Sequence, residues 1–70
     1  MMNKYEIIIY WSKADEAFIA EIPELNGCIA HGDTQYEALR EISIVADEWL
    51  QIAKEKGWKI PDPKGRLMYA

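Results

Sequence analysis

The first half of the chain alternates short hydrophobic stretches with turn-forming residues. These stretches are rich in β-branched and aromatic side chains, which favour extended backbone, and they predict three strands, over residues 4–11, 17–22 and 28–32. Pro23 has no amide proton to donate to a strand ladder, so we expect it to end the second strand. Asn26-Gly27 tolerates positive φ and predicts a turn before the third strand.

After residue 34 the hydrophobic spacing changes to three and four residues, which predicts an amphipathic helix over residues 35–56. Its expected buried stripe consists of Leu39, Ile42, Ala46, Trp49 and Ala53. Thr34 and Glu37 form a capping box, in which each side chain accepts a hydrogen bond from the backbone amide of the other residue. Gly57 suits the position after the helix. Residues 66–69 predict a short final strand.

The resulting order, β-β-β-α-β, predicts an α+β fold in which one long helix packs on a small, mostly antiparallel sheet. A single helix covers only one face of such a sheet. Alternation along the first strand places large apolar side chains, Ile8 and Tyr10 among them, on the second face as well. We expect a homodimer or higher homo-oligomer with Ile8 and Tyr10 at its interface. The alternative is that both are half-exposed surface residues.

Seventy residues predict one domain, 1–70. The net charge of −4 and the absence of a strong Lys/Arg cluster disfavour direct nucleic-acid binding. An acidic surface suits either solubility alone or a basic protein partner. No apolar run approaches the ~20 residues of a membrane helix. A single cysteine without a signal-peptide pattern predicts a cytoplasmic protein.

Catalytic chemistry finds little support in the residue pattern. Cys28, His31 and Asp33 are close in sequence, but the odd separation of Cys28 from His31 points them to opposite faces of one strand. Cys28 is better interpreted as a small buried residue. No zinc-like spacing is present. We therefore expect no catalytic residue, metal ligand or cofactor.

Two sets of residues are candidates for binding a partner. On the outer face of the helix, Ile44 lies among charges that include Glu37 and Glu48, which suits either a solvated face or an acidic ridge with an apolar anchor. Asp15 and Glu16, in the hairpin loop, suit either an ordinary polar turn or contact with a basic active site. Aromatic residues are frequent in binding hot spots, and the candidates by residue type are Tyr10, Trp11, Trp58 and Tyr69.

The sequence resembles the HicB antitoxin family over nearly its whole length. The resemblance rests on residues 5–11, 15–20, 23–28, 32–34 and 37–39, followed by Trp49, Ala53-Lys54, Gly57, Ile60-Pro61 and Pro63-Lys64. It implies a partial ribonuclease H-like fold and a role in binding and neutralising the HicA toxin. That toxin is an mRNA-cleaving ribonuclease with a double-stranded-RNA-binding-like fold and a catalytic histidine. Many HicB members add a C-terminal DNA-binding domain, whereas this sequence stops at Ala70.

The expected function is therefore that of a non-enzymatic, antitoxin-like module of a type II toxin–antitoxin system. It would occlude a small, basic, HicA-type mRNA interferase. One alternative is an orphan homo-oligomeric structural or regulatory protein without a toxin partner. Another is a residual metal-dependent nuclease, for which the strands offer only Glu6 and Glu21 as metal ligands.

Overall fold

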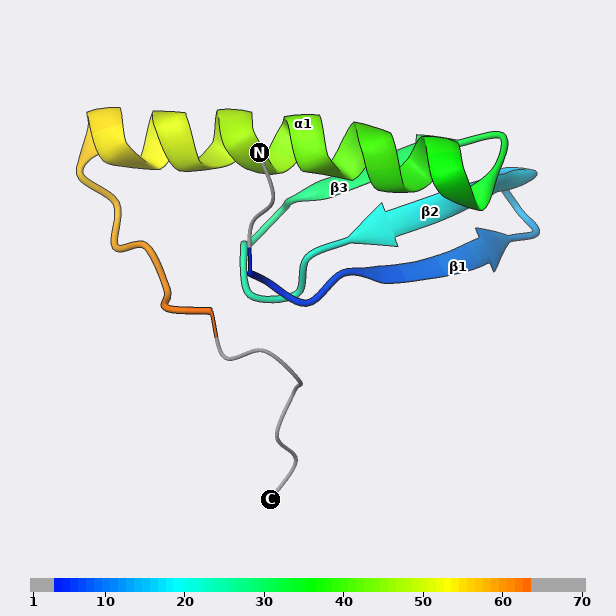
Figure 1. The fold of residues 1–70 in the computed structure, drawn as a ribbon, viewed down its shortest axis with the longest axis horizontal. Helices are drawn as coiled ribbons and strands as arrows, with labels where there is room; N and C mark the ends of the chain where they lie inside the picture. Colours follow the sequence, from blue (N-terminus) through cyan, green and yellow to red (C-terminus); the bar gives the residue numbers. More distant parts are fainter. Residues whose placement is uncertain (1–3, 64–70) are drawn as a thin grey trace, which may run out of the picture.

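Three antiparallel strands and one long helix form the described part of the protein, residues 4–63, in the computed structural model (Figure 1). In chain order the elements are β1 (Ile8–Ser12), β2 (Ala17–Glu21), β3 (Ile29–Gly32) and α1 (Gln35–Lys56). The strands lie in the order β1-β2-β3. The predicted α+β arrangement is confirmed, and the helix has the predicted bounds. The predicted strand over residues 66–69 lies outside the described residues.

The first strand begins later than the sequence pattern predicts, at Ile8 instead of residue 4. Ile8 pairs with Glu21, the last residue of β2, so residues 4–7 have no strand opposite them. Beyond Glu21 the chain turns into a loop closed by its own backbone bonds, including Ile22 N–H to the Cys28 carbonyl at 3.1 Å. The neighbouring Pro23 cannot extend the ladder because it lacks an amide proton.

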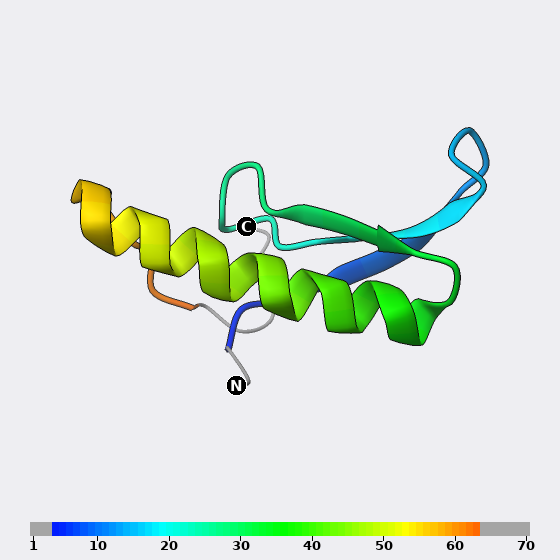
Figure 2. The same cartoon turned by 90° about the horizontal axis from the view of Figure 1, so that it is seen from above.

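The hydrophobic core lies between α1 and the inner face of the sheet. Strand register aligns Ile9, Ala20 and Ala30 across the three strands on this face. The buried core cluster consists of Tyr5, Ala20, Ile22, Leu25, Cys28, Ala38, Ile42 and Ala46. Figure 2 shows α1 lying along the sheet, and its closest association is with β3.

The buried stripe of α1 differs from the predicted one at its first position. Ala38 is fully buried, whereas Leu39 is 41% exposed. The remaining predicted positions, Ile42, Ala46 and Ala53, are buried, and Trp49 packs against the core. Because the helix lies mainly over β3, the small side chain at position 38 faces the sheet and Leu39 falls on the flank. The sequence prediction for Leu39 was therefore wrong.

Both ends of α1 are capped. Thr34 Oγ1 accepts the Glu37 N–H at 3.0 Å, as predicted. The Glu37 carboxylate accepts the amide proton of Asp33, at 2.9 Å, and not that of Thr34 as the capping-box pattern predicts. Gly57 ends the helix with φ +71°, and its N–H donates to the Ala53 carbonyl. Both helix bounds thus follow from local hydrogen bonds.

Thr34→Ala is expected to lower the free energy of unfolding by about 1 kcal/mol, because it leaves the Glu37 amide without its side-chain acceptor. Urea denaturation followed by circular dichroism measures this loss. Thr34→Ser keeps the hydroxyl and serves as the control. Equal stability of the alanine and serine variants would contradict a capping role.

The described helix is not long and apolar enough to serve as a membrane span.

Candidate protein-binding surface

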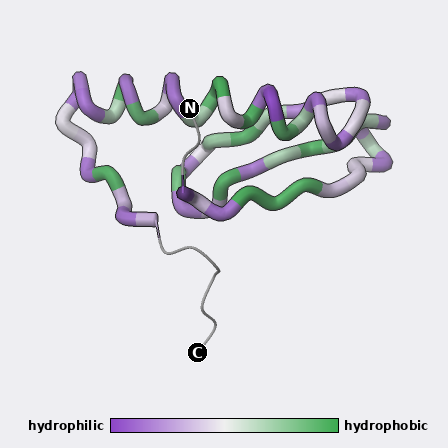
Figure 3. Tube along the Cα trace, in the orientation of Figure 1, coloured by the Kyte–Doolittle hydropathy of each residue, from purple (hydrophilic) through white to green (hydrophobic). Residues whose placement is uncertain are grey.

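The face of the sheet turned away from α1 is largely apolar. Register aligns Tyr10, Ile19 and His31 in one row across the strands, and Ile8 and Ile29 flank Glu21 in the next. Tyr10 is 44% exposed and Ile29 is 52% exposed, whereas Ile19 is buried. Figure 3 shows hydrophobic stretches on all three strands. We name this surface the open sheet face. It contains both predicted interface residues, Ile8 and Tyr10.

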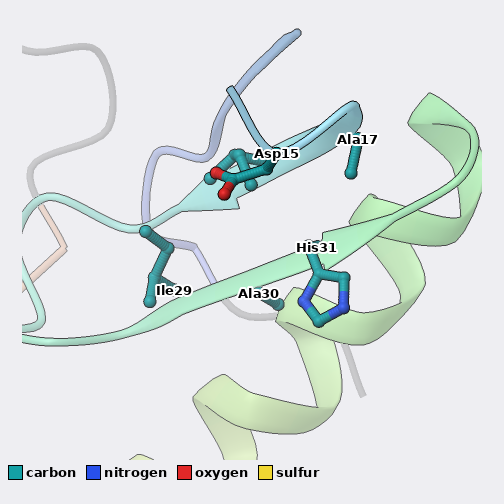
Figure 4. A pocket seen from close by; sticks show the side chains of 6 residues that line it. Asp15, Ala17, Ile29, Ala30 and His31 are labelled. Carbon is teal, nitrogen blue, oxygen red and sulfur yellow. The ribbon is translucent and has the colours of Figure 1, made fainter. Parts of the chain in front are cut away.

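A hollow of about 400 Å³ lies at the open sheet face (Figure 4). Its lining residues come from the hairpin loop, β2 and β3, and are Asp15, Ala17, Ile19, Ile29, Ala30 and His31. The Ser12 hydroxyl donates to Asp15 Oδ2 at 2.9 Å and accepts the Asp15 N–H at 3.2 Å, which fixes the loop. The hollow thus combines an apolar floor with one carboxylate and one imidazole. Such a mixture suits contact with another protein surface.

One flank of α1 carries a second candidate surface. Carboxylates and isoleucines follow one another there at spacings of three and four residues, so they share a side of the helix. We name this surface the acidic stripe: Glu37, Glu41, Ile44, Glu48, Ile52 and Glu55. Ile44 is 49% exposed, and Glu48 is exposed as well. The predicted exposure of Ile44 among carboxylates is confirmed.

The first turn of the acidic stripe adjoins the outer edge of β3. Glu37, Glu41 and Val45 line a groove of about 460 Å³ whose other wall includes His31 and Asp33. Glu37 is partly committed to capping α1 through the Asp33 amide. Glu41 Oε2 lies 3.9 Å from Arg40 Nη2. Such an exposed ion pair contributes little to stability. The groove therefore presents several carboxylates to solvent.

The predicted partner-binding residues fall into two groups. Asp15 and Glu16 lie in the exposed hairpin loop, at the end of the sheet where α1 also begins (Figure 1). Ile44 and Glu48 lie further along the helix. Glu37 is at the same end of the molecule as the hairpin loop, but it belongs to the acidic stripe. The structure therefore brings the five residues onto two surfaces and not into one pocket.

Cys28 and His31 occupy opposite sides of the sheet, as the sequence predicts. Cys28 belongs to the core and is 2% exposed, and burial raises the pKa of its thiol. His31 is exposed and lines the hollow on the open sheet face. Within residues 4–63, no three His, Cys, Asp or Glu side chains form a group able to hold a metal ion. Glu6 and Glu21, which the nuclease alternative invokes, thus join no described ligand set.

Several exposed hydrophobic residues were not identified from the sequence. Ile29, Tyr36 and Leu39 are all exposed. Side chains two positions apart in a strand share one face, so the position of Ile29 relative to His31 would have placed it on the open sheet face. Trp11 and Trp58, selected by residue type, are also exposed. Trp11 makes an edge-to-face contact with Phe18, with ring centroids 5.1 Å apart. Tyr69 lies outside the described residues.

Comparison with known proteins gives a family match. A family model described as UPF0150-like matches residues 3–61. The UPF0150 protein ssl0259 of Synechocystis sp. (strain ATCC 27184 / PCC 6803 / Kazusa) is 47% identical over 63 residues, which cover 90% of this chain and 85% of the relative. No solved structure gives a significant match.

Proposed function

This chain belongs to the UPF0150-like family, and we propose that it acts as an antitoxin-like protein-binding module of a type II toxin–antitoxin system. Its partner is a small, basic, HicA-type mRNA interferase, which it neutralises by covering the toxin's RNA-binding or catalytic surface. The resemblance of the sequence to HicB antitoxins supports this assignment. The mechanism requires binding only and no turnover.

The acidic stripe is the observation that carries the proposal. Ile44 and Ile52 stand exposed on a helix flank among carboxylates. Fully burying an isoleucine side chain contributes about 1.5–3 kcal/mol; because Ile44 and Ile52 are already about half buried, a partner that covers either one gains about 1 kcal/mol. The surrounding carboxylates favour a basic surface and disfavour an acidic one.

The same charge arrangement explains how binding would block a ribonuclease. RNA presents a row of negative phosphates, and proteins that bind it gather Lys and Arg to meet them. A helix flank lined with carboxylates offers charge of the same sign as RNA. A toxin surface that attracts RNA therefore also attracts the acidic stripe, and the two compete for one place. Inhibition is steric and electrostatic.

Ile44→Lys tests this surface. We expect it to weaken binding to a HicA-type toxin by about tenfold or more, because it removes an apolar anchor and adds a charge repelled by a basic partner. Isothermal titration calorimetry gives the affinity, and circular dichroism checks folding. Tyr36→Lys places the same charge on the other flank of α1 and is the matched control. Unchanged affinity of Ile44→Lys would remove the acidic stripe from the interface.

The open sheet face supports a second candidate, self-association without a toxin partner. Tyr10 and Ile29 expose large side chains around a hollow on a sheet face that no described element covers. A second copy of the chain can cover such an apolar face, because most soluble oligomers are symmetric homo-oligomers. Tyr10→Glu is expected to shift the chain toward monomer in sedimentation-velocity experiments, and Lys13→Glu in the exposed loop is the control. A wild-type chain that is monomeric at high concentration would contradict this candidate.

A further inference from the structure

Two tryptophans meet near the C-terminal end of α1. Trp49, on the helix, and Trp58, just beyond it, have ring centroids 5.9 Å apart with planes inclined by 58°. With the loop before β3 and the segment after the helix, they enclose a recess of about 360 Å³. Its lining residues are Glu24, Asn26, Trp49, Trp58, Lys59 and Pro61. We name it the tryptophan recess.

Hydrogen bonds order the Trp49 indole and the backbone of the tryptophan recess. Trp49 Nε1–H donates to the Asn26 carbonyl at 2.8 Å, which fixes the indole against the loop. The Trp58 amide donates to the Ala53 carbonyl at 2.9 Å. The Tyr5 hydroxyl donates to the Pro61 carbonyl and ties the segment after the helix to the segment before β1. A site ordered in this way loses little entropy on binding.

The recess combines an open aromatic face with negative charge. Trp58 is 49% exposed, so part of its indole ring is open to solvent. Indole is the aromatic side chain that interacts most strongly with a cation above its ring. Glu24 is half-buried at the wall. Burial and the nearby carboxylates of Glu24 and Asp62 raise the pKa of Tyr5, the residue whose hydroxyl contacts Pro61. Lys59 also lines the recess, and its positive charge would repel a cationic ligand.

We propose that the tryptophan recess receives the guanidinium group of an arginine presented by a protein partner. An arginine stacks its planar group on an indole while its fork of N–H donors meets a carboxylate, which a lysine ammonium cannot do. Trp58 supplies the stacking surface and Glu24 the carboxylate. If that partner is the toxin, the inference rests on the proposed function and adds one specific arginine contact to it.

The direct test uses the peptide acetyl-Gly-Arg-Gly-amide and its citrulline counterpart, which has the same shape without the charge. Indole N–H signals in nitrogen-15 NMR spectra report each tryptophan separately. We expect the arginine peptide to shift the Trp58 and Trp49 signals, and the citrulline peptide to bind about tenfold more weakly. Trp11, at the other end of β1, is an internal control and should not shift.

Variants locate the contact. Trp58→Ala should abolish the response, Trp58→Phe should retain part of it, and Glu24→Gln should weaken binding about fivefold or more. Lys59→Ala should strengthen binding of the arginine peptide, because it removes a positive charge that repels the guanidinium. Equal binding of the two peptides, or equal shifts at Trp11, would overturn the proposal.

A binding assay with the HicA-type toxin separates this inference from the proposed function. Weaker toxin binding by Trp58→Ala, with the fold intact by circular dichroism, supports both. Full toxin binding by Trp58→Ala overturns the arginine contact and leaves the function standing. If the wild-type chain binds no toxin, the function is contradicted, and the peptide titration alone decides whether the recess accepts an arginine.

Discussion

Gly32→Ala is expected to lower the free energy of unfolding by about 3 kcal/mol, the upper end of the usual cost of overpacking. A methyl group at position 32 would lie 2.6 Å from the Ala38 amide nitrogen and 2.7 Å from Glu37 Cβ. The third close atom, the Glu37 carbonyl carbon at 2.9 Å, is also part of the helix. Because two of these atoms are backbone, relief requires α1 to move away from β3.

Gly27→Ala is the matched control for that prediction. Gly27 has φ +80°, but nothing lies within 4 Å of the position its Cβ would take. Its substitution by alanine is expected to cost about 1 kcal/mol, from the left-handed backbone alone. Urea denaturation of the two variants compares close packing with backbone strain. Equal losses at the two positions would show that the contact between β3 and α1 is looser than the structure describes.

Ile42→Ala is expected to lower the free energy of unfolding by about 2–5 kcal/mol. Ile42 is fully buried at the centre of the face that α1 turns toward the sheet. Single cores below about 70–80 residues rarely supply more than about 3–5 kcal/mol. The variant should therefore be largely unfolded near room temperature unless oligomerisation or a partner stabilises it.

Ile44→Ala, two residues further along the same helix, is the control for Ile42→Ala. Ile44 is half exposed, and its change should alter stability by about 0.5 kcal/mol or less. Thermal unfolding followed by circular dichroism at 222 nm measures both variants. A small loss at Ile42 would contradict the packing of α1 on the sheet. A large loss at Ile44 would place the acidic stripe in an oligomer interface.

Local signals in the sequence were enough to define α1. Thr34, Glu37 and Gly57 fix the ends of the helix through hydrogen bonds to backbone groups within a few residues. Turn residues and Pro23 likewise indicated where β2 ends. Alternation predicted that Ile8 and Tyr10 lie on the face turned away from the helix. Each of these features depends on neighbours in the chain, so the sequence alone contains the necessary information.

Other features depended on how the elements dock. The start of β1 is decided by where β2 ends, because residues 4–7 have no strand to pair with. Leu39 was assigned to the core because position 39 fits a helical stripe as well as position 38 does. The crossing of α1 over β3, with Gly32 allowing close approach, decides between them.

The candidate surfaces divide in the same way. Helical spacing in the sequence alone placed Glu37, Ile44 and Glu48 on one exposed face, whereas the exposure of Ile52 in the acidic stripe came only from the structure. The tryptophan recess joins Glu24 and Asn26 to Trp49 and Trp58, residues more than twenty positions apart. Spacing along a chain determines which side chains share one element. Only the packing of separate elements decides which distant side chains meet, because that depends on the volumes and backbone contacts of the whole core.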